Sequence, residues 1–389
     1  MARRSGIQWR PVTSARWRTL PINPAWSDPL ELGVLKKRRP RYAGKNPRGF
    51  HEKYKEHDPA RYASDVEKVL ASGKTPAGMH RPIMVTEVID ALRPAAGDLA
   101  LDCTLGRGGH ARVILDRILP GGRLIGCDVD PIELPRTEAD LRAAGFSPDV
   151  FEAHRTNFAG VTKVLAGRLA DVVLADLGVS SMQLDNPDRG FSYKEDGPLD
   201  MRMNPAKGEP AATWLQRLSE RELADLLVEN ADEPYAEEIA RMLKRCAEQP
   251  GVSTKAVANA VRDGLASAFP RLDAVELTRS VRRTFQALRI AVNEEFVVLD
   301  ALLRVLPQCL APGGRVAILT FHSGEDRRVK RAFQDGHRSG IYADVAADVQ
   351  RATPEERRAN PRASSAKLRW AVKARDLASS EPKGSLGTS

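Results

Sequence analysis

The chain has few of the residues that cross-link a fold. Among its 389 residues are only four cysteines, Cys103, Cys127, Cys246 and Cys309. No two of them form a Cys-x-x-Cys pair, which argues against a cysteine metal site and against a disulfide framework. This pattern is typical of buried free thiols in a reducing compartment. We therefore expect a cytoplasmic protein that binds no metal.

Long apolar runs are absent as well. No stretch of about 18 apolar residues occurs, so we expect no membrane span. The first residues include arginines, but they lack the apolar segment of a secretory signal. Hydrophobic residues make up 42% and charged residues 29% of the chain, which is typical of a globular protein with a core. At this length we expect one large domain with an insertion or a second domain.

The net charge of +9 is concentrated at one end. Residues 1–50 contain 12 Lys/Arg and two acids, so the other 339 residues carry a net charge of about −1 by difference. Basic residues interleaved with tryptophans are typical of an arm that lies on nucleic-acid phosphates and stacks on bases. A solubilising tail without fixed structure has the same composition, and both interpretations stay open.

The most informative stretch is residues 99–110. Leu99–Cys103 is predicted to be a buried strand, followed by a Gly-Arg-Gly-Gly loop and a helix that starts near His110. Glycine lets a backbone approach a ligand closely because it has no Cβ. The helix start offers N–H groups to the same ligand. This pattern predicts a nucleotide-like site.

Further apolar strands follow, and they alternate with helices. Arg123–Cys127 precedes Asp128, about 20 residues beyond the glycines, which is the spacing of a carboxylate that holds ribose hydroxyls. Ala170–Ala175 precedes Asp176 in the same way. Such strands imply a parallel sheet, and ligands bind at the carboxyl ends of its strands. The residues expected at this edge are Gly106 to Gly109, Asp128, Phe158 and Asp176.

The pattern changes in the second half of the chain. Residues 184–210 are loop-like, and residues 211–281 are helical without a strand pattern. The α/β pattern then resumes. The elements expected there are a long helix Thr284–Val305, a strand Arg315–Phe321, a helix Arg327–Phe333 and a last strand Lys367–Val372.

The glycine loop alone does not decide the chemistry, because nicotinamide, flavin and adenosylmethionine enzymes share it. The loop is Gly-x-Gly-Gly rather than Gly-x-Gly-x-x-Gly, and no Gly-Lys-Ser/Thr P-loop is present. A carboxylate such as Asp176 suits a cationic ligand, for example a sulfonium, better than a pyrophosphate. These features favour an S-adenosylmethionine-dependent methyltransferase over a Rossmann oxidoreductase.

Between residues 80 and 372 the chain carries a series of longer motifs. They include Asp102-Cys-Thr-Leu-Gly-Arg-Gly-Gly-His110, Asp176-Leu-Gly-Val-Ser-Ser-Met-Gln-Leu-Asp185 and Arg283-Thr-Phe-Gln-Ala-Leu-Arg-Ile290. In sequence and order these motifs resemble the RsmH (MraW) family. The resemblance implies an enzyme that uses S-adenosyl-L-methionine to methylate the exocyclic amino nitrogen of a P-site cytidine in 16S ribosomal RNA. The implied partner is 16S rRNA within the small ribosomal subunit, and a homodimer stays open.

The resemblance also implies an α/β architecture. We expect a Rossmann-like class I methyltransferase fold, with a mostly parallel sheet, helices on both faces and an all-helical insertion domain. The expected divisions are a basic, partly disordered extension (1–79), the methyltransferase domain in two parts (80–186 and 282–375), a helical RNA-recognition insertion (187–281) and a disordered tail (376–389).

Site residues follow from the same motifs. The implied cofactor contacts are Gly108, Gly109 and His110 in the loop, Asp128 at the ribose, Phe158 near the adenine, and Asp176 and Gln183 near the methionine part and the target base. Asp176 and His322 are the catalytic candidates, because either could accept a hydrogen bond from the target amino group and help remove its surplus proton. Arg202, Arg283 and Arg289 are candidates for phosphate contacts.

Each assignment has a structural alternative. His110 could cap the loop, Phe158 and His322 could simply be packed, and the arginines could be ordinary ion-pair residues. Two other functions also stay open, a Rossmann oxidoreductase and a ribosome assembly factor without this activity. A DNA amino-methyltransferase usually has two prolines and an aromatic after its strand-four Asp or Asn, where this chain has Asp176-Leu-Gly-Val.

Overall fold

The structure is a computed structural model, and it describes residues 82–375. The expected extension (1–79) and tail (376–389) lie outside the described residues. None of the helices between residues 82 and 375 is long and apolar enough to span a membrane.

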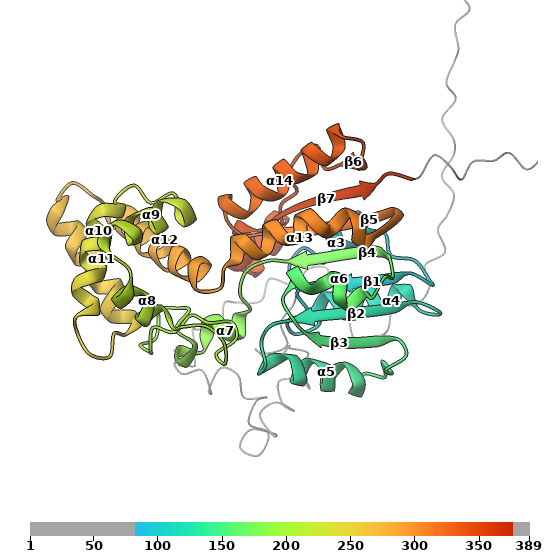
Figure 1. Cartoon of the computed structure of the whole chain (residues 1–389), viewed down its shortest axis with the longest axis horizontal. Helices are drawn as coiled ribbons and strands as arrows, with labels where there is room; N and C mark the ends of the chain where they lie inside the picture. Colours follow the sequence, from blue (N-terminus) through green and yellow to red (C-terminus); the bar gives the residue numbers. More distant parts are fainter. Residues whose placement is uncertain (1–81, 376–389) are drawn as a thin grey trace, which may run out of the picture. The chain divides into compact units, whose positions relative to one another are not determined.

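In the described part of the chain, seven strands form one sheet in the order β3-β2-β1-β4-β5-β7-β6 (Figure 1). Strands β1 to β5 are parallel, and β7 pairs antiparallel with both β5 and β6. The strands are β1 (Leu99–Asp102), β2 (Arg123–Asp128), β3 (Phe151–Arg155), β4 (Ala170–Asp176), β5 (Leu310–Thr320), β6 (Tyr342–Val345) and β7 (Lys367–Lys373). The expected mostly parallel α/β sheet is confirmed. Its strand order reverses between β1 and β4, where ligands bind in such sheets.

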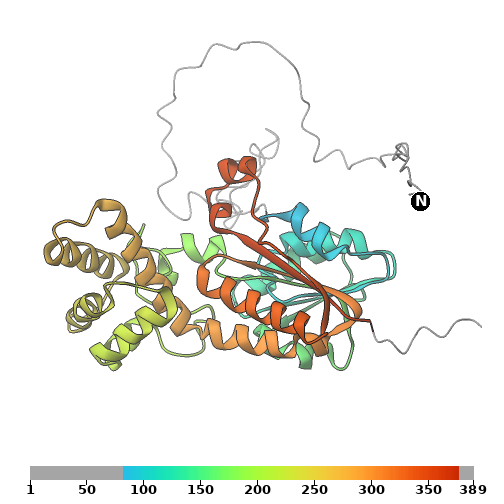
Figure 2. The same cartoon turned by 90° about the horizontal axis from the view of Figure 1, so that it is seen from above.

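Apolar side chains cover both faces of the sheet because they alternate along each strand. On β4, Val172 and Leu174 join one buried cluster, while Val173 and Ala175 join another. The first cluster includes residues of α3 (Val85–Leu92), α4 (Gly109–Ile118) and α5 (Glu133–Ala143). The second includes residues of α6 (Val161–Leu165), α13 (Glu295–Cys309) and α14 (Ser323–Arg338), and Figure 2 shows α13 and α14 side by side.

A third buried cluster belongs to the helical stretch of the sequence. Its helices are α8 (Ala211–Arg217), α9 (Glu220–Ala231), α10 (Ala236–Ala247), α11 (Thr254–Ala268) and α12 (Ala274–Val292). Serine side chains cap two of them, because Ser219 accepts from the Glu222 N–H and Ser253 from the Ala256 N–H. The shorter elements are η3 (Phe158–Gly160), α7 (Ser181–Asp185), η4 (Pro187–Arg189), α15 (Pro354–Ala359) and η5 (Pro361–Ser365).

The expected long helix Thr284–Val305 is wrong. Helix α12 ends at Val292 and α13 begins at Glu295, because Glu294 adopts a left-handed conformation with φ 52°. The Asn293 side chain holds this break, since it donates to the Met201 carbonyl and accepts from the Met203 N–H. Apolar periodicity runs through the break, so the sequence pattern did not reveal it.

Three smaller expectations also need correction. Strand β5 begins at Leu310 rather than at Arg315, and α14 covers Ser323–Arg338 rather than 327–333. Strand β6 was not expected, because it has four residues and only Tyr342 among them is fully buried. Short edge strands of this kind carry little hydrophobic pattern.

Candidate functional site

A cavity of about 1080 Å³ lies at the carboxyl ends of β1, β2 and β4, beside the reversal in strand order. It is bounded by the glycine loop, by residues after β4, and by residues of the 202–214 segment and of α12 and α13. The lining includes most of the residues expected at the site, namely Gly109, His110, Asp128, Phe158, Asp176, Gln183, Arg202 and Arg289. The sheet edge therefore brings together side chains that are far apart in sequence.

The glycine loop is built so that it packs tightly on α5. Gly108 has φ 70° and precedes the first residue of α4. A Cβ at this position would lie 3.1 Å from Thr137 Cγ2 and 3.3 Å from Leu141 Cδ1. Thr137 also donates its hydroxyl to the Gly106 carbonyl at 2.6 Å. The loop backbone is thereby held at the cavity wall, with the start of α4 behind it.

Asp128 is fixed by two backbone donors. Its Oδ2 accepts from the Gly106 N–H at 2.8 Å, and its Oδ1 accepts from the Asp130 N–H at 2.9 Å. Burial raises the pKa of this carboxyl, and the two hydrogen bonds oppose the rise. Asp128 also lines the cavity, so its orientation is set before any hydroxyl reaches it.

Asp176 and His110 meet across the cavity wall. His110 Nε2 lies 2.9 Å from the Ile83 carbonyl oxygen, and Nδ1 lies 3.6 Å from Asp176 Oδ2. Within residues 82–375, Asp176 Oδ1 is buried without a hydrogen-bond partner. Burial, followed by the charges of Asp102 and Glu325, raises the pKa of Asp176 to about 8. Burial lowers the pKa of His110 to about 4.

Gln183 lies at the cavity, but its amide already has structural partners. Its Oε1 accepts from the Ser180 N–H at 2.9 Å and completes the cap of α7. Its Nε2 donates to Asp130 Oδ2, also at 2.9 Å. The expected contact of Gln183 with the methionine part or the target base therefore stays a prediction.

Two buried residues that sequence reasoning missed join the parts of the site. Arg189 donates to Asp130 Oδ2 at 2.9 Å and to the Met203 carbonyl at 2.8 Å. Asp130 also caps the start of α5 through the N–H of Ile132. The signal available in the sequence was the Asp-Val-Asp-Pro spacing after β2, where the second Asp attracted no role of its own.

All three candidate arginines form ion pairs within the chain. Arg202 donates to both oxygens of Asp200, at 2.9 and 2.6 Å, and Arg289 donates to both oxygens of Glu295, at 2.7 and 2.8 Å. Arg283 pairs with Glu276 at 3.2 Å and is not among the described residues that line the cavity.

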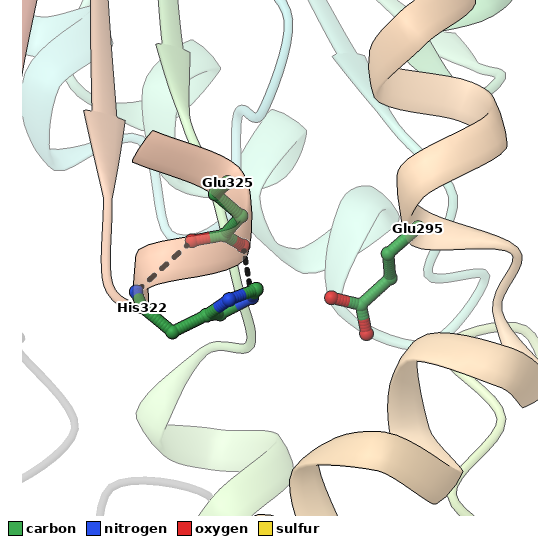
Figure 3. Close-up of side chains that lie close together, drawn as sticks. All are labelled: Glu295, His322 and Glu325. Carbon is green, nitrogen blue, oxygen red and sulfur yellow. Dashed lines mark hydrogen bonds and ion pairs between the residues drawn. The ribbon is translucent and has the colours of Figure 1, made fainter. Parts of the chain in front are cut away.

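His322 lies beside the cavity rather than in its described lining. It precedes α14, and its Nε2 is 3.1 Å from Glu325 Oε1, while Glu295 faces the pair from α13 (Figure 3). These three side chains offer ligand atoms within 4.8 Å of one another, a spacing that could admit a metal ion. Arg289 already neutralises Glu295. The expectation of no bound metal stays a prediction, as does the catalytic role of His322.

The site fits an adenosylmethionine cofactor on three observations. The loop lines the cavity with Gly106 and Gly109, although Gly108 is not in the described lining. Asp128 presents a fixed acceptor. Asp176 lines the cavity, and its buried Oδ1 has no hydrogen-bond partner within residues 82–375, which suits a cation. Together with the strand order, these observations define a Rossmann-like methyltransferase.

Comparison with known proteins identifies the family of this chain. Residues 77–374 match the MraW methylase family, and the chain belongs to that family as an S-adenosylmethionine-dependent methyltransferase. It is 49% identical over 348 residues to ribosomal RNA small subunit methyltransferase H 1 of Lachnoclostridium phytofermentans, covering 87% of this chain and 93% of that one. The namesake protein of Agathobacter rectalis is 47% identical over 344 residues, covering 87% and 98%. A SAM-dependent O-methyltransferase structure from Thermotoga maritima is 10% identical, covers 77% and 69%, and has a TM-score of 0.36.

Proposed function

We propose that this methyltransferase transfers the methyl group of S-adenosylmethionine to the exocyclic amino nitrogen of a P-site cytidine in 16S ribosomal RNA. The observation that carries the proposal is the Asp176 carboxyl, which lines the cavity between the glycine loop and the segment 202–214 and has one oxygen without a hydrogen-bond partner within residues 82–375. The names of the relatives, which are small-subunit ribosomal RNA methyltransferases, support the choice of RNA.

The chemistry explains why a carboxylate is needed at this position. The lone pair of a cytosine amino group is delocalised into the ring, so the nitrogen is a poor nucleophile. A hydrogen bond from this amino group to Asp176 localises the lone pair and gives the surplus proton an acceptor. The cavity then has to hold the two reactants in line and away from water.

The substrate has to reach the cavity as an unstacked base. A cytidine in folded RNA must leave its stack before its amino group can approach Asp176. We propose that residues 187–281 form the RNA-recognition insertion. Arg202 within it, and Arg283 and Arg289 just beyond its end, would be phosphate contacts. Each of these arginines would exchange a carboxylate for a phosphate. The basic residues 1–50 would add contacts that depend on salt concentration.

Location and assembly follow from the substrate. The RNA would be met within the small ribosomal subunit in the cytoplasm. A homodimer stays a prediction.

The decisive experiment is a labelling assay on ribosomal particles. Purified 30S subunits are incubated with the full chain and S-adenosylmethionine labelled in its methyl group, and the RNA is digested to nucleosides. We expect label on the amino nitrogen of one cytidine. Label on another base, on protein or on DNA would contradict the proposal.

Two controls separate the alternatives. The Asp176→Asn variant keeps the size of the side chain but loses the proton acceptor, and it should still bind cofactor while losing most of its activity. Binding to 30S subunits without any labelling would favour an assembly factor. A titration that detected a nicotinamide cofactor instead of S-adenosylmethionine would favour an oxidoreductase.

A further inference from the structure

The contact between Asp176 and His110 has a consequence for the order of proton transfer. We propose that, in the protein free of cofactor, the pair formed by Asp176 and His110 binds one extra proton at neutral pH. Binding of the sulfonium-bearing cofactor expels this proton before any methyl group moves. The inference rests on the methyltransferase assignment and deepens the proposed function.

The first support is the hydrogen bond on the other side of the imidazole. His110 Nε2 lies 2.9 Å from the Ile83 carbonyl, which is only an acceptor, so Nε2 must carry a hydrogen. In the neutral ring Nδ1 then presents a lone pair toward Asp176 Oδ2, 3.6 Å away. A lone pair facing a charged carboxylate is repulsive, and a proton on either group removes the repulsion. The count of one proton is the same whether oxygen or nitrogen carries it.

The second support is the charge around the pair. Asp102 on β1 and Glu325 on α14 both act on Asp176 and disfavour a further negative charge. Asp102 is itself almost fully buried. Arg289 on α12 is a neighbouring cation, but its Nε and Nη2 are bound to Glu295.

The direction of the pKa shifts agrees with this geometry. Burial is the largest cause for both groups, and it raises the pKa of Asp176 to about 8 while it lowers that of His110 to about 4. At neutral pH the proton therefore resides mainly on the carboxyl. A positive charge brought next to Asp176 favours the ionised form, so the proton leaves.

The proton balance of the reaction then closes. The amino nitrogen forms the new N–C bond, the C–S bond breaks, and its electron pair stays on sulfur. The surplus proton of the nitrogen passes to the Asp176 carboxylate. The sulfur product carries no charge, so the pair keeps this proton until the next cofactor binds. The net proton of each turnover is thus released to solvent at cofactor binding.

Proton release can be counted by calorimetry of the full chain at pH 7 in buffers of different ionisation enthalpy. We expect S-adenosylmethionine to release about one proton per site. S-adenosylhomocysteine has a neutral sulfur and should release close to none. The release should fade as the pH rises above about 8.

Variants assign the proton to the pair. Asp176→Asn should abolish the release, whereas Asp188→Asn removes an exposed carboxyl in η4 and should leave the release unchanged. If both cofactor forms release the same number of protons, or if Asp176→Asn still releases one, the proposal is wrong.

A second measurement needs no variant of Asp176. With aspartate carboxyl carbons labelled by ¹³C, Asp102 should titrate near pH 7 and Asp176 near pH 8 in the cofactor-free protein. The carboxyl that titrates near pH 8 should be ionised at pH 7 with S-adenosylmethionine bound. If no carboxyl titrates near pH 8 before the cofactor is added, the proposal fails. Neither measurement uses RNA. If the labelling assay places no label on 30S subunits but cofactor binding still releases a proton, only the proposed RNA substrate is wrong.

Discussion

The sheet side and the helical side of the cavity differ in whether their charged side chains have partners of opposite charge. On the sheet side, the carboxyl of Asp176 lies close to other acids, and one of its oxygens has no hydrogen-bond partner within residues 82–375. On the helical side, Arg202 and Arg289 each donate two hydrogen bonds to a carboxylate. One wall is poised to receive a cation, whereas the other is neutralised by its own residues.

This difference in charge compensation distinguishes the Asp176 side of the cavity, which is preorganised for a cation, from the arginine side, where a ligand must first replace an acid. Burial raises the pKa of Asp176, so its charged form is unfavourable until a cation arrives. Burial also acts to raise the pKa of Asp200, but the hydrogen bonds and charge of Arg202 hold it below its ordinary value. A phosphate that approached Arg202 would have to compete with Asp200 for its two donors.

The largest expected effect comes from breaking the link between the two walls. Asp130 and Arg189 form an ion pair with side chains only 2% and 9% exposed. Removing one partner leaves a buried charge uncompensated, so Arg189→Met should lower the free energy of unfolding by about 3–5 kcal/mol. Denaturant titration measures the loss. Arg217→Met is the matched control, because Arg217 is 57% exposed in its pair with Glu209, and equal losses in both variants would contradict the prediction.

The next effect concerns the sheet side alone. Asp128→Ala removes the acceptor of the Gly106 and Asp130 N–H groups and the expected ribose contact. Hydrogen bonds to charged groups contribute about 1.5–3 kcal/mol, so cofactor affinity should fall at least about tenfold in calorimetry. Asp140→Ala, which removes a half-exposed carboxyl on α5, should leave the affinity unchanged. An unchanged affinity in Asp128→Ala would mean that the ribose assignment is wrong.

A pH series tests whether the Asp176 carboxyl is neutral in the folded chain. Its folded pKa is raised to about 8, so the folded state binds a proton more tightly than the unfolded state. Stability from this group is present at low pH and is lost as the pH rises through 8. Between pH 6.5 and 8 the wild type should lose roughly 1 kcal/mol per pH unit relative to Asp176→Asn. If the free energy of unfolding changes with pH in the same way for the two proteins, the Asp176 carboxyl is already ionised in the folded wild type.

The smallest effect is expected on the helical side. Arg283 is about one quarter exposed and pairs with Glu276. Arg283→Ala should therefore lower the free energy of unfolding by only about 0.2–1 kcal/mol. One lost phosphate contact should reduce the salt slope of RNA binding by about one unit or less. A loss of RNA affinity that does not depend on salt would point to a structural role for Arg283 instead.

Local patterns in the sequence were enough for the sheet side of the molecule. Apolar strands, the glycine loop, and the acids Asp128 and Asp176 at strand ends all follow from short segments, because parallel strands place their carboxyl ends at one edge. The break between α12 and α13 did not follow, since Asn293 is held by residues 201 and 203, about 90 positions away. The ion pair of Asp130 and Arg189 did not follow from the sequence either, because these residues are 59 positions apart and meet only in the folded chain.

By itself, the sequence determined the α/β class, the glycine loop and the methyltransferase family, because these depend on local periodicity and on motifs in order. Only the tertiary structure decided which charges are compensated. It pairs Arg202, Arg283 and Arg289 with acids, places His322 beside Glu325, and leaves Asp176 facing His110. The arginines and His322 pair with acids two to seven positions away, so the backbone conformation between the partners decides each pairing. The contact of Asp176 with His110 joins residues 66 positions apart, and no local pattern records it.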